Sequence, residues 1–494
     1  MPSTGRIFKS LNLLYRFAYL YDEVCFNQIV MKKKISFSVN PVNTLFPGLL
    51  IAGSLFLRTY SLTQNYVTTF AGTGSPGFVN GDTSTASFNK PFGICIDSLG
   101  NLFIADAYNH VIRKIGIDGM VSTFAGSGIA GYADGEASVA RFNQPINICF
   151  DPYGNMFVSD FLNQRIRKID TSGMVSTIAG SGIAGLLDGI SMDAQFNYPR
   201  GICIDDTGNI YIGDSWNHRI RRISTDGWVT TWAGGGENIG VQSIGSWVDG
   251  SDTAARFYTP CELSIDSENN IYVADAYNHR IRKVDSDRTV TTVAGSGESG
   301  PNSGGFQNGP ALESRFNTPT AVSKANSGEI FVGDGINQRV RRIDTGFMVS
   351  TFAGSGETGF SNGADTSATF NFPRGCTMDY NLNRLYVVDY NNHAVRIVHL
   401  ETATGGLLNQ KMPDGILIYP NPSQNKITVE FGSAVADVGF RLLDLSGRDV
   451  CFPKSDCLSK QVMNLAFLEP GIYLMQIYSG THVISVNKII LLDQ

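Results

Sequence analysis

The feature that most constrains this chain is a six-residue segment that recurs along it. The segment VTTFAG begins at Val67. Close copies begin further on, at Val121, Val175, Val229, Val290 and Val349. A regular period of this kind is typical of proteins built from one repeated supersecondary unit, so the repeat decides the fold class.

Each repeat unit contains four short segments with the composition of β-strands. In the third unit they read FNYPRGICID, GNIYIGD, SWNHRIRRI and VTTW. The apolar pieces are rich in β-branched and aromatic residues and are bounded by turn residues. Four strands per unit in six units predict an all-β fold, a six-bladed β-propeller.

The phase of the repeat predicts how the ring closes. No copy of VTTFAG follows the last third strand, at residues 394–398, whereas the first copy, at 67–72, precedes every full unit. We therefore expect residues 67–72 to complete the blade formed by residues 373–398. Such pairing removes the exposed edge that an open array would present.

Residues between the second and third predicted strands carry a family resemblance. The pair Asn-His occurs at 109–110, 217–218, 278–279 and 392–393, and Asn-Gln replaces it at 163–164 and 337–338. With the pattern VSTFAGSG…DG…A…FN-x-P, these pairs resemble NHL repeats, most closely the teneurin-like kind, over about residues 65–400. The resemblance implies a six-bladed propeller used mainly as a binding platform.

A residue that recurs in every blade is expected to serve the blade. We therefore predict that the Asn-His pairs make turn hydrogen bonds between the second and third strands. Each strand-ending Asp, as at Asp106, lies seven residues before an Arg, as at Arg113, and a hairpin can join the two in an ionic clasp. Calcium binding by these Asp residues is the alternative, although the D-x-D-x-D-G loop is absent.

Loops on a rigid scaffold are where binding residues tend to lie, and two groups break the repeat pattern there. The first is aromatic and precedes the repeated Asn: Tyr108, Trp216 and Tyr277. The second is polar and is predicted to ring the mouth of the central channel: Asn147, Arg200, Glu262 and Arg374. The alternatives are packing against a neighbouring connection for the first group and ordinary solvation of the rim for the second.

The function predicted from these features is non-catalytic recognition of a protein or glycan. The competing prediction is a metal-dependent propeller lyase or lactonase-like hydrolase, because related propellers have these activities. No predicted innermost strand carries a His, and no CxxC or Cys/His metal spacing occurs. We therefore expect no cofactor, apart from the calcium alternative.

Composition bears on partners and on the cysteines. The formal charge is −6, with 38 basic and 44 acidic residues, which argues against nucleic acid as a partner. Of the eight cysteines, Cys95, Cys149 and Cys203 share one position in three blades. Equivalent positions in adjacent blades are expected to lie too far apart for a disulfide, so we predict buried free thiols.

The N-terminal residues resemble a targeting segment. Three lysines follow Met31, and an uncharged apolar run spans residues 45–57. The run is short for a membrane-spanning helix, so residues 31–64 are predicted to be a signal-peptide region and residues 1–30 a misassigned extension. An N-terminal membrane anchor is the alternative.

The C-terminal residues differ in character from the repeats. After a predicted linker at 401–415, strand-like segments predict a small β-sandwich over 416–494. The segments YPNPS, DLSGRDV, LEPGIYLMQI and NKIILL resemble the type A C-terminal sorting domain of type IX secretion cargo. This resemblance implies passage through the periplasm, contact with the type IX machinery, and a secreted or outer-membrane surface location. The alternative is a generic β-sandwich adhesion module. In an oxidising compartment, Cys451 and Cys457 could form a disulfide that closes a short loop.

Overall fold

The structure is a computed structural model. It describes residues 65–235, 245–379, 382 and 384–400 and, in the C-terminal part, the strands and a few further residues between 416 and 491. The predicted extension at 1–30, the signal region at 31–64 and the linker at 401–415 lie outside the described residues. No helix among the described residues is both long and apolar enough to cross a membrane.

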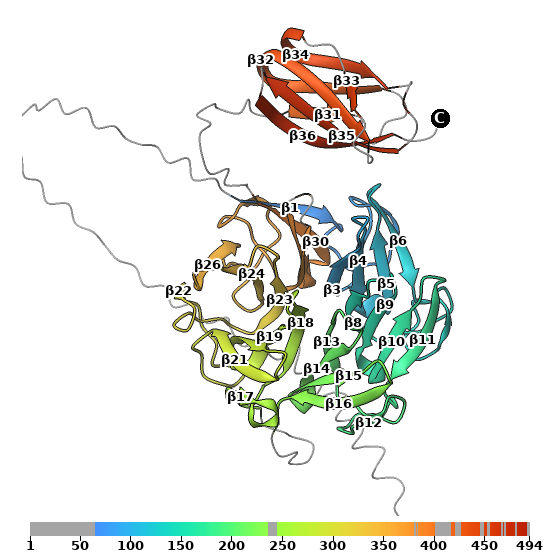
Figure 1. The fold of residues 1–494 in the computed structure, drawn as a ribbon, viewed down its shortest axis with the longest axis vertical. Coiled ribbons are helices and arrows are strands. Elements are labelled where there is room, and N and C mark those ends of the chain that lie inside the picture. Colours follow the sequence, from blue (N-terminus) through green and yellow to red (C-terminus); the bar gives the residue numbers. More distant parts are fainter. Residues whose placement is uncertain are drawn as a thin grey trace, which may run out of the picture. The chain divides into compact units, whose positions relative to one another are not determined.

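Six separate sheets are arranged around a common centre, as Figure 1 shows. The strand next to the centre begins at a proline in every sheet. These innermost strands are β3 (Pro91–Ile96), β8 (Pro145–Phe150), β13 (Pro199–Ile204), β18 (Pro260–Ile265), β23 (Pro319–Lys324) and β28 (Pro373–Asp379). The predicted six-bladed propeller is therefore confirmed.

Each blade continues outward through antiparallel neighbours. The second strands, which all end in Asp, are β4 (Leu102–Asp106), β9 (Met156–Asp160), β14 (Ile210–Asp214), β19 (Ile271–Asp275), β24 (Ile330–Asp334) and β29 (Arg384–Asp389). The third strands are β5 (Val111–Ile115), β10 (Arg165–Ile169), β15 (Arg219–Ile223), β20 (Arg280–Val284), β25 (Arg339–Ile343) and β30 (Ala394–His399).

The repeated segment VTTFAG forms the fourth strand of each blade. These strands are β6 (Met120–Ala125), β11 (Met174–Ala179), β16 (Trp228–Ala233), β21 (Thr289–Ala294), β26 (Met348–Ala353) and β1 (Tyr66–Ala71). A two-residue fifth strand pairs outside each of them, one more strand per blade than predicted. The fifth strands are β2 (Gly81–Asp82), β7 (Gly135–Glu136), β12 (Gly189–Ile190), β17 (Gly250–Ser251), β22 (Gly309–Pro310) and β27 (Gly363–Ala364).

The ring closes through the first and last strands of the repeat region. β1 pairs antiparallel with β30, with Val67 opposite Val398 and Thr68 opposite Ile397. β27 then pairs with the other edge of β1. The predicted closure is confirmed, and the sixth blade is assembled from both ends of the propeller sequence.

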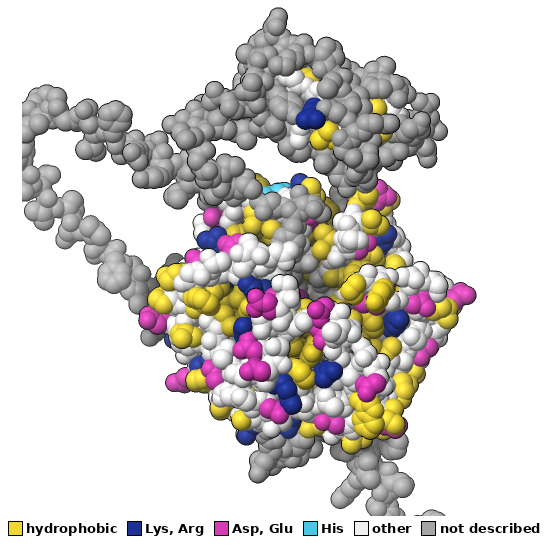
Figure 2. Space-filling view, in the orientation of Figure 1, with side chains coloured by type: hydrophobic (Ala, Val, Ile, Leu, Met, Phe, Trp, Pro, Cys, Tyr) yellow, Lys and Arg dark blue, Asp and Glu magenta, His cyan; other side chains and the backbone are white. Residues whose placement is uncertain are grey.

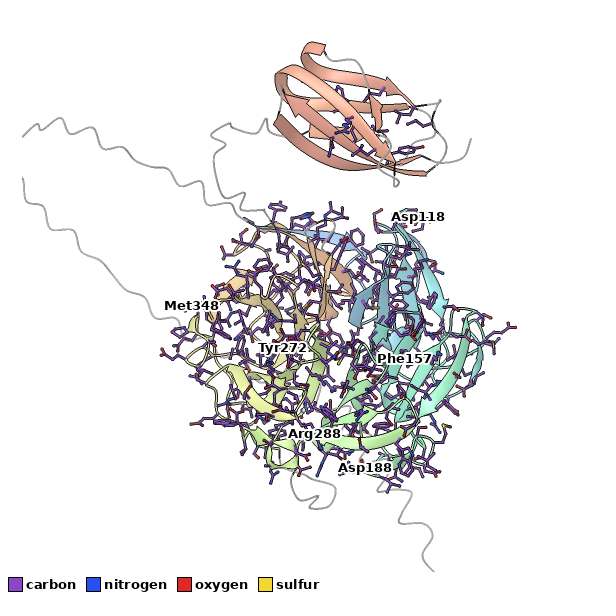
Figure 3. The ribbon with its side chains drawn as sticks, viewed as in Figure 1. Asp118, Phe157, Asp188, Tyr272, Arg288 and Met348 are labelled. Carbon is purple, nitrogen blue, oxygen red and sulfur yellow. The ribbon has the colours of Figure 1, made fainter. Side chains whose placement is uncertain are left out.

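The core lies between adjacent blades. One cluster joins Ala71 of β1, Ile94 of β3 and Val388 of β29, and similar clusters lie at the other blade contacts. A fully buried Phe before each innermost strand belongs to these clusters, as Phe88 and Phe142 do. Figure 3 shows Phe157 of β9 and Tyr272 of β19 toward the middle of the ring and Met348 at its periphery.

Between the second and third strands, five blades have a one-turn 3-10 helix. These helices are η1 (Ala107–Asn109), η2 (Phe161–Asn163), η3 (Ser215–Asn217), η5 (Ala276–Asn278) and η6 (Tyr390–Asn392), and η4 (Asp252–Ala254) lies elsewhere, after β17. The residue after each of the five has a positive φ, as at His110, and closes the turn. The five turns therefore present equivalent residues at the same end of their blades.

The C-terminal part is a second all-β unit. Its strands are β31 (Ile416–Tyr419), β32 (Lys426–Asp444), β33 (Asp449–Cys451), β34 (Ser455–Asn464), β35 (Gly471–Ser479) and β36 (His482–Leu491). The long strand β32 pairs with β31, β33, β34 and β35. Leu442, Met475 and Ile477 are buried within the unit. The side chains of Cys451 and Cys457 lie outside the described residues, so their pairing stays a prediction.

Candidate ligand-binding site

Every blade holds the predicted Asp–Arg clasp in a fully buried position. The Arg Nη1 atom lies 2.7–2.9 Å from the carboxylate of the Asp seven residues earlier. In the first blade Arg113 also donates to the carbonyls of Ser87 and Val79, and its guanidinium lies 5.0 Å from the Phe88 ring. The pairs are Asp106–Arg113, Asp160–Arg167, Asp214–Arg221, Asp275–Arg282, Asp334–Arg341 and Asp389–Arg396.

The Asp of the clasp also organises the turn. Asp106 Oδ1 accepts the backbone N–H of Asn89, and its Oδ2 accepts hydrogen bonds from Asn109 and Arg113. Burial raises the pKa of Asp106 to about 6, against these donors, so the group is ionised at neutral pH. The oxygens that a calcium ion would need are used here by N–H donors.

The predicted turn hydrogen bonds are made by the Asn side chain and by the His backbone N–H, which donates to the carbonyl of Ala107 in the first blade, whereas the His ring makes a contact that was not predicted. Asn109 donates to Asp106 within the turn, as expected. The His110 ring instead reaches the next blade, where its Nδ1 accepts the backbone N–H of Gln144 at 3.2 Å. Gln164 makes the equivalent bond through Oε1 to the N–H of Tyr198 at 2.6 Å. An imidazole and an amide thus supply the same acceptor between neighbouring blades.

Cys95, Cys149 and Cys203 are free thiols in the structure, as predicted. Cys95, Cys149, Cys203, Cys261 and Cys376 form no disulfide. Cys203 is buried, and Cys95 and Cys149 are half-buried against the clusters between blades. Burial raises the pKa of the Cys95 and Cys203 thiols well above the ordinary value. These thiols therefore pack as small apolar groups.

Innermost strands approach one another closely at the channel mouth. A Cβ atom on Gly93 would lie 2.6 Å from the carbonyl oxygen of Ile146, and one on Gly201 would lie 2.2 Å from that of Cys261. Backbone approach this close requires glycine. The predicted residues Asn147 and Glu262 occupy the equivalent position in the blades that follow these glycines.

Asn147 and Glu262 come together although one blade lies between theirs in the sequence. The Asn147 side chain and the backbone N–H of Val322 both hydrogen-bond to the Glu262 carboxyl. Glu262 is buried, and its Oε2 has no partner in the structure. Burial raises the pKa of Glu262 well above the ordinary value. Burial at this position therefore favours the neutral form of the carboxyl group.

Arg200 and Arg374, the other two predicted polar residues, share an aromatic neighbour. The Arg374 guanidinium carbon lies 4.1 Å from the Phe92 ring centre, and that of Arg200 lies 5.8 Å from it. Arg374 also lies 4.2 Å from the Tyr390 ring and 4.7 Å from the Phe372 ring. We call Phe92, Phe372 and Tyr390 the aromatic cup.

The three predicted aromatic residues each pack against a different group. Tyr108 lies under the Lys90 ammonium, 4.9 Å from its ring centre. Trp216 packs against Tyr198 with ring centres 5.0 Å apart, and Tyr277 packs against Tyr258 at 5.3 Å. Trp216 nevertheless remains 41% exposed, and Tyr108 and Tyr277 are half-buried.

Sequence reasoning missed one position that contributes to this surface. The residue before each blade proline has a positive φ, and its N–H donates to the His or Gln of the preceding blade. Lys90, Tyr198 and Phe372 occupy this position and contact the aromatic residues described above. An alignment of the six repeats could have identified these three residues, because each has a large side chain at a position that varies between blades.

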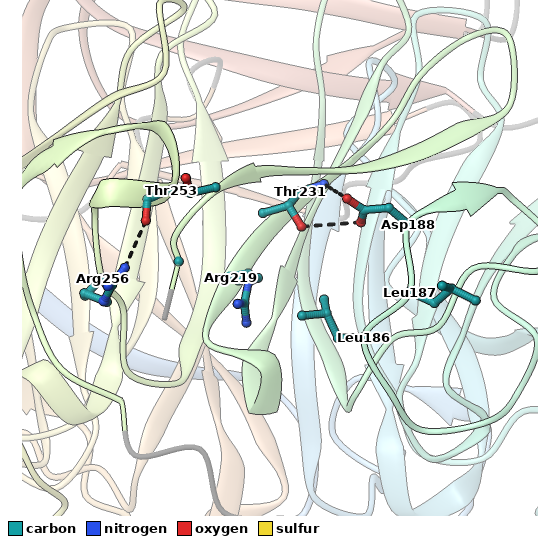
Figure 4. A pocket seen from close by; sticks show the side chains of 8 residues that line it. Leu186, Leu187, Asp188, Arg219, Thr231, Thr253 and Arg256 are labelled. Carbon is teal, nitrogen blue, oxygen red and sulfur yellow. Dashed lines mark hydrogen bonds between the residues drawn. The ribbon is translucent and has the colours of Figure 1, made fainter. Parts of the chain in front are cut away.

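A separate pocket of about 590 Å³ lies beside the third blade (Figure 4). Its lining includes Arg219, Leu186 and Asp188, whose carboxylate accepts the N–H of Thr231 at 3.0 Å. In other blades an aromatic ring covers the equivalent Arg, as Tyr132 covers Arg165 at 3.9 Å. Leu186 replaces that ring here and leaves the space open. The pocket reaches Gly235, and residues 236–244 lie outside the described part.

On the face drawn in Figure 2, basic and acidic side chains are interspersed among hydrophobic ones. Within the described residues no three His, Cys, Asp or Glu side chains are grouped so that they could hold a metal ion.

The fold is a six-bladed propeller, and family matches identify NHL repeats within it and a C-terminal sorting domain after it. Residues 196–223, 257–284 and 370–398 match the family described as NHL repeat. Residues 417–492 match the family described as secretion system C-terminal sorting domain. Such a tail directs export by type IX secretion, to the cell surface or the medium, and implies interaction with that machinery.

Curated relatives resemble the repeat region. Human NHL repeat-containing protein 2 is 29% identical over 352 residues, which cover 62% of this chain and 47% of the relative. Chicken teneurin-1 is 28% identical over 228 residues, covering 41% of this chain and 8% of the relative. This chain thus spans about half or less of these relatives.

A solved structure shares the fold. An auxiliary nutrient binding protein from Bacteroides thetaiotaomicron has a TM-score of 0.51 and 17% identity, covering 68% of this chain and 76% of that one.

Proposed function

We propose that the exported propeller is a non-catalytic recognition module that binds a protein or a glycan. The proposed binding face is the one where the turns between second and third strands meet the channel mouth. The observation that carries this proposal is the accumulation of aromatic side chains there, on loop positions that differ between blades. Tyr198, for example, packs against both Phe161 and Trp216, so aromatic surface passes from one blade to the next.

Such a surface suits recognition for a physical reason. Aromatic rings bring large contact area with little conformational freedom to lose, and they stack on sugar rings and on protein side chains. The clasps and blade contacts beneath them hold the turns rigid, which lowers the entropic cost of binding. The name of the Bacteroides structure supports including nutrient molecules among the ligands tested, alongside proteins and glycans.

The test is a glycan and protein array probed with the purified full-length chain. The variants Tyr108→Ala, Trp216→Ala and Tyr277→Ala are probed in parallel. Tyr153→Ala is the control, because Tyr153 is 83% exposed on the turn between β8 and β9, at the opposite end of its blade. We expect at least one of the three variants to lose binding, whereas the control keeps it. Equal binding by all four variants would show that the ligand binds elsewhere.

A further inference from the structure

The guanidinium of Arg374 is buried without a polar partner. The residue is 5% exposed, and its Nε and Nη1 atoms are buried with no hydrogen-bond partner. Among the described residues it forms no ion pair, and its neighbours are the three rings of the aromatic cup. A guanidinium has five N–H donors, and burying them unsatisfied costs stability.

The blade itself does not require this Arg. In the same blade, Arg396 donates from Nη1 and Nη2 to Asp389, Asn362 and two carbonyls, and only its Nε lacks a partner. At the position of Arg374, one other blade carries Arg200, and the remaining four carry Phe92, Ile146, Cys261 or Thr320. An apolar or small residue therefore meets the structural need in four blades, whereas Nε and Nη1 of Arg374 are left without a hydrogen-bond partner in the sixth.

The surroundings of the cup are cationic and apolar. The Lys90 ammonium lies 5.6 Å from the Tyr390 ring, and the Arg200 guanidinium reaches the Phe92 ring from another blade. The carboxyl group of Glu262, on an innermost strand, accepts hydrogen bonds from Asn147 and Val322. Lys90 forms no ion pair among the described residues. The cup thus gathers positive charge next to ring faces.

We propose that the aromatic cup binds the carboxylate of a ring-shaped anionic ligand, such as a uronic acid residue of an acidic glycan. Arg374 supplies paired N–H donors, whose planar geometry matches a carboxylate. Lys90 adds a second charge, and the exposed parts of Phe372 and Tyr108 offer faces for the sugar ring. This proposal rests on the proposed recognition function and specifies its ligand class.

Isothermal calorimetry with the full-length chain tests the ligand class. The probes are trigalacturonate, its methyl ester, which has the same ring without the charge, and inorganic phosphate, which has charge without a ring. We expect trigalacturonate to bind and the other two to bind at least about tenfold more weakly, as expected for a charged hydrogen-bonded pair. Equal binding of the ester would overturn the anionic assignment, and equal binding of phosphate would overturn the ring assignment.

Variants locate the site. Arg374→Met is expected to weaken trigalacturonate binding about 10- to 100-fold with only a small decrease in the thermal midpoint, since the variant loses the ring contacts of the guanidinium but no hydrogen bond of the fold. Arg374→Lys, which keeps the charge but lacks the planar fork, covers the case in which Arg374→Met folds poorly, and is also expected to weaken binding. Arg342→Met is the control, because Arg342 pairs with Glu329 at a half-exposed site.

The results separate this proposal from the one it rests on. If no variant changes trigalacturonate binding, or if trigalacturonate does not bind at millimolar concentration, the proposal for the cup is wrong. The array with Tyr108, Trp216 and Tyr277 variants still decides whether the propeller is a recognition module.

Discussion

At the scale of single residues, each blade depends on one buried charge pair, and the Arg of that pair donates to further acceptors at the edge of the blade. In the third blade, Arg221 joins the buried Asp214 and the half-exposed Asp188. In the fifth blade, an amide oxygen of Asn308 takes the place of that outer carboxylate. The inner carboxylate is present in all six blades, so the two acidic partners of Arg221 are expected to differ in importance.

We expect Asp214→Asn to destabilise the propeller by about 3–5 kcal/mol, because it leaves the buried Arg221 charge without its counterion. Asp188→Asn is the matched control and should cost about 1 kcal/mol or less, because its partner pair is partly solvated and Asn already serves in other blades. Urea unfolding monitored by fluorescence measures both changes. Equal losses in the two variants would contradict the central role of the inner carboxylate.

The bonds between blades introduce a dependence on pH. His110 accepts through Nδ1 and must be neutral to do so, and burial lowers the pKa of His110 below its ordinary value of 6.5. The folded protein thus binds this proton less readily than the unfolded chain. The contribution of this hydrogen bond to stability is therefore fully present above about pH 6.5, and it is lost as the pH decreases through the folded-state pKa of His110.

The variant His110→Gln tests this dependence, because Gln164 already makes the same bond with an amide that does not titrate. We expect its unfolding midpoint to match the wild type at about pH 8 and to fall less at about pH 5. Gln164→His should show the opposite change. Since all other titrating groups are shared, parallel pH curves for the three proteins would rule out the imidazole as the cause.

At the scale of elements, closure of the ring is the feature on which the propeller depends. β1 is the fourth strand of a blade whose other strands lie about 300 residues further along the chain. Val67 is fully buried there, which contributes about 2 kcal/mol by itself. Without β1, both β30 and β27 would lack their partner.

Deletion of residues 1–72 is therefore expected to lower the urea midpoint and to promote association through the exposed edge of β30. Light scattering measures the association, and fluorescence measures the midpoint. Deletion of residues 1–64 is the control and should leave both unchanged, since β1 remains. Identical behaviour of the two truncations would mean that the strand pairing contributes little.

At the scale of the whole molecule, the C-terminal unit directs export, and recognition is the role that we propose for the propeller. A chain that lacks residues 416–494 is expected to accumulate in the periplasm of a host with type IX secretion. Residues 401–494 fused to a periplasmic reporter should carry the reporter to the surface or the medium. Cell fractionation and protease accessibility measure both. Export of the truncated chain would contradict the assigned role of the tail.

The arrangement of strands could be predicted from the sequence because it repeats. Six copies in phase imply one blade structure, and the displaced first copy, at Val67, implies closure by β1. The Asp–Arg clasp was also predictable, since a separation of seven residues across a short hairpin brings Asp106 of β4 close to Arg113 of β5. The fifth strand was missed because two residues such as Gly81 and Asp82 are too few to show a strand pattern.

The neighbours of the site residues could not be predicted from the sequence. The repeat alignment selects Arg374, Arg200 and Glu262 as exceptions, but it does not say what surrounds them. The partners of Arg374 come from three places in the chain: Phe92 in the first blade and Phe372 and Tyr390 in the sixth. Likewise, Asn147 meets Glu262 across the channel mouth because the intervening blade has Gly201 there.

The sequence alone determined the blade number, the closing strand and the export tail, because the first two follow from the number and the phase of the repeats and the third from local motifs. Only the tertiary structure decided that His110 links two blades and that Arg374 is buried among rings without a polar partner. Those contacts are made between blades around the ring, and the repeat pattern shows which positions vary but not which side chains meet there.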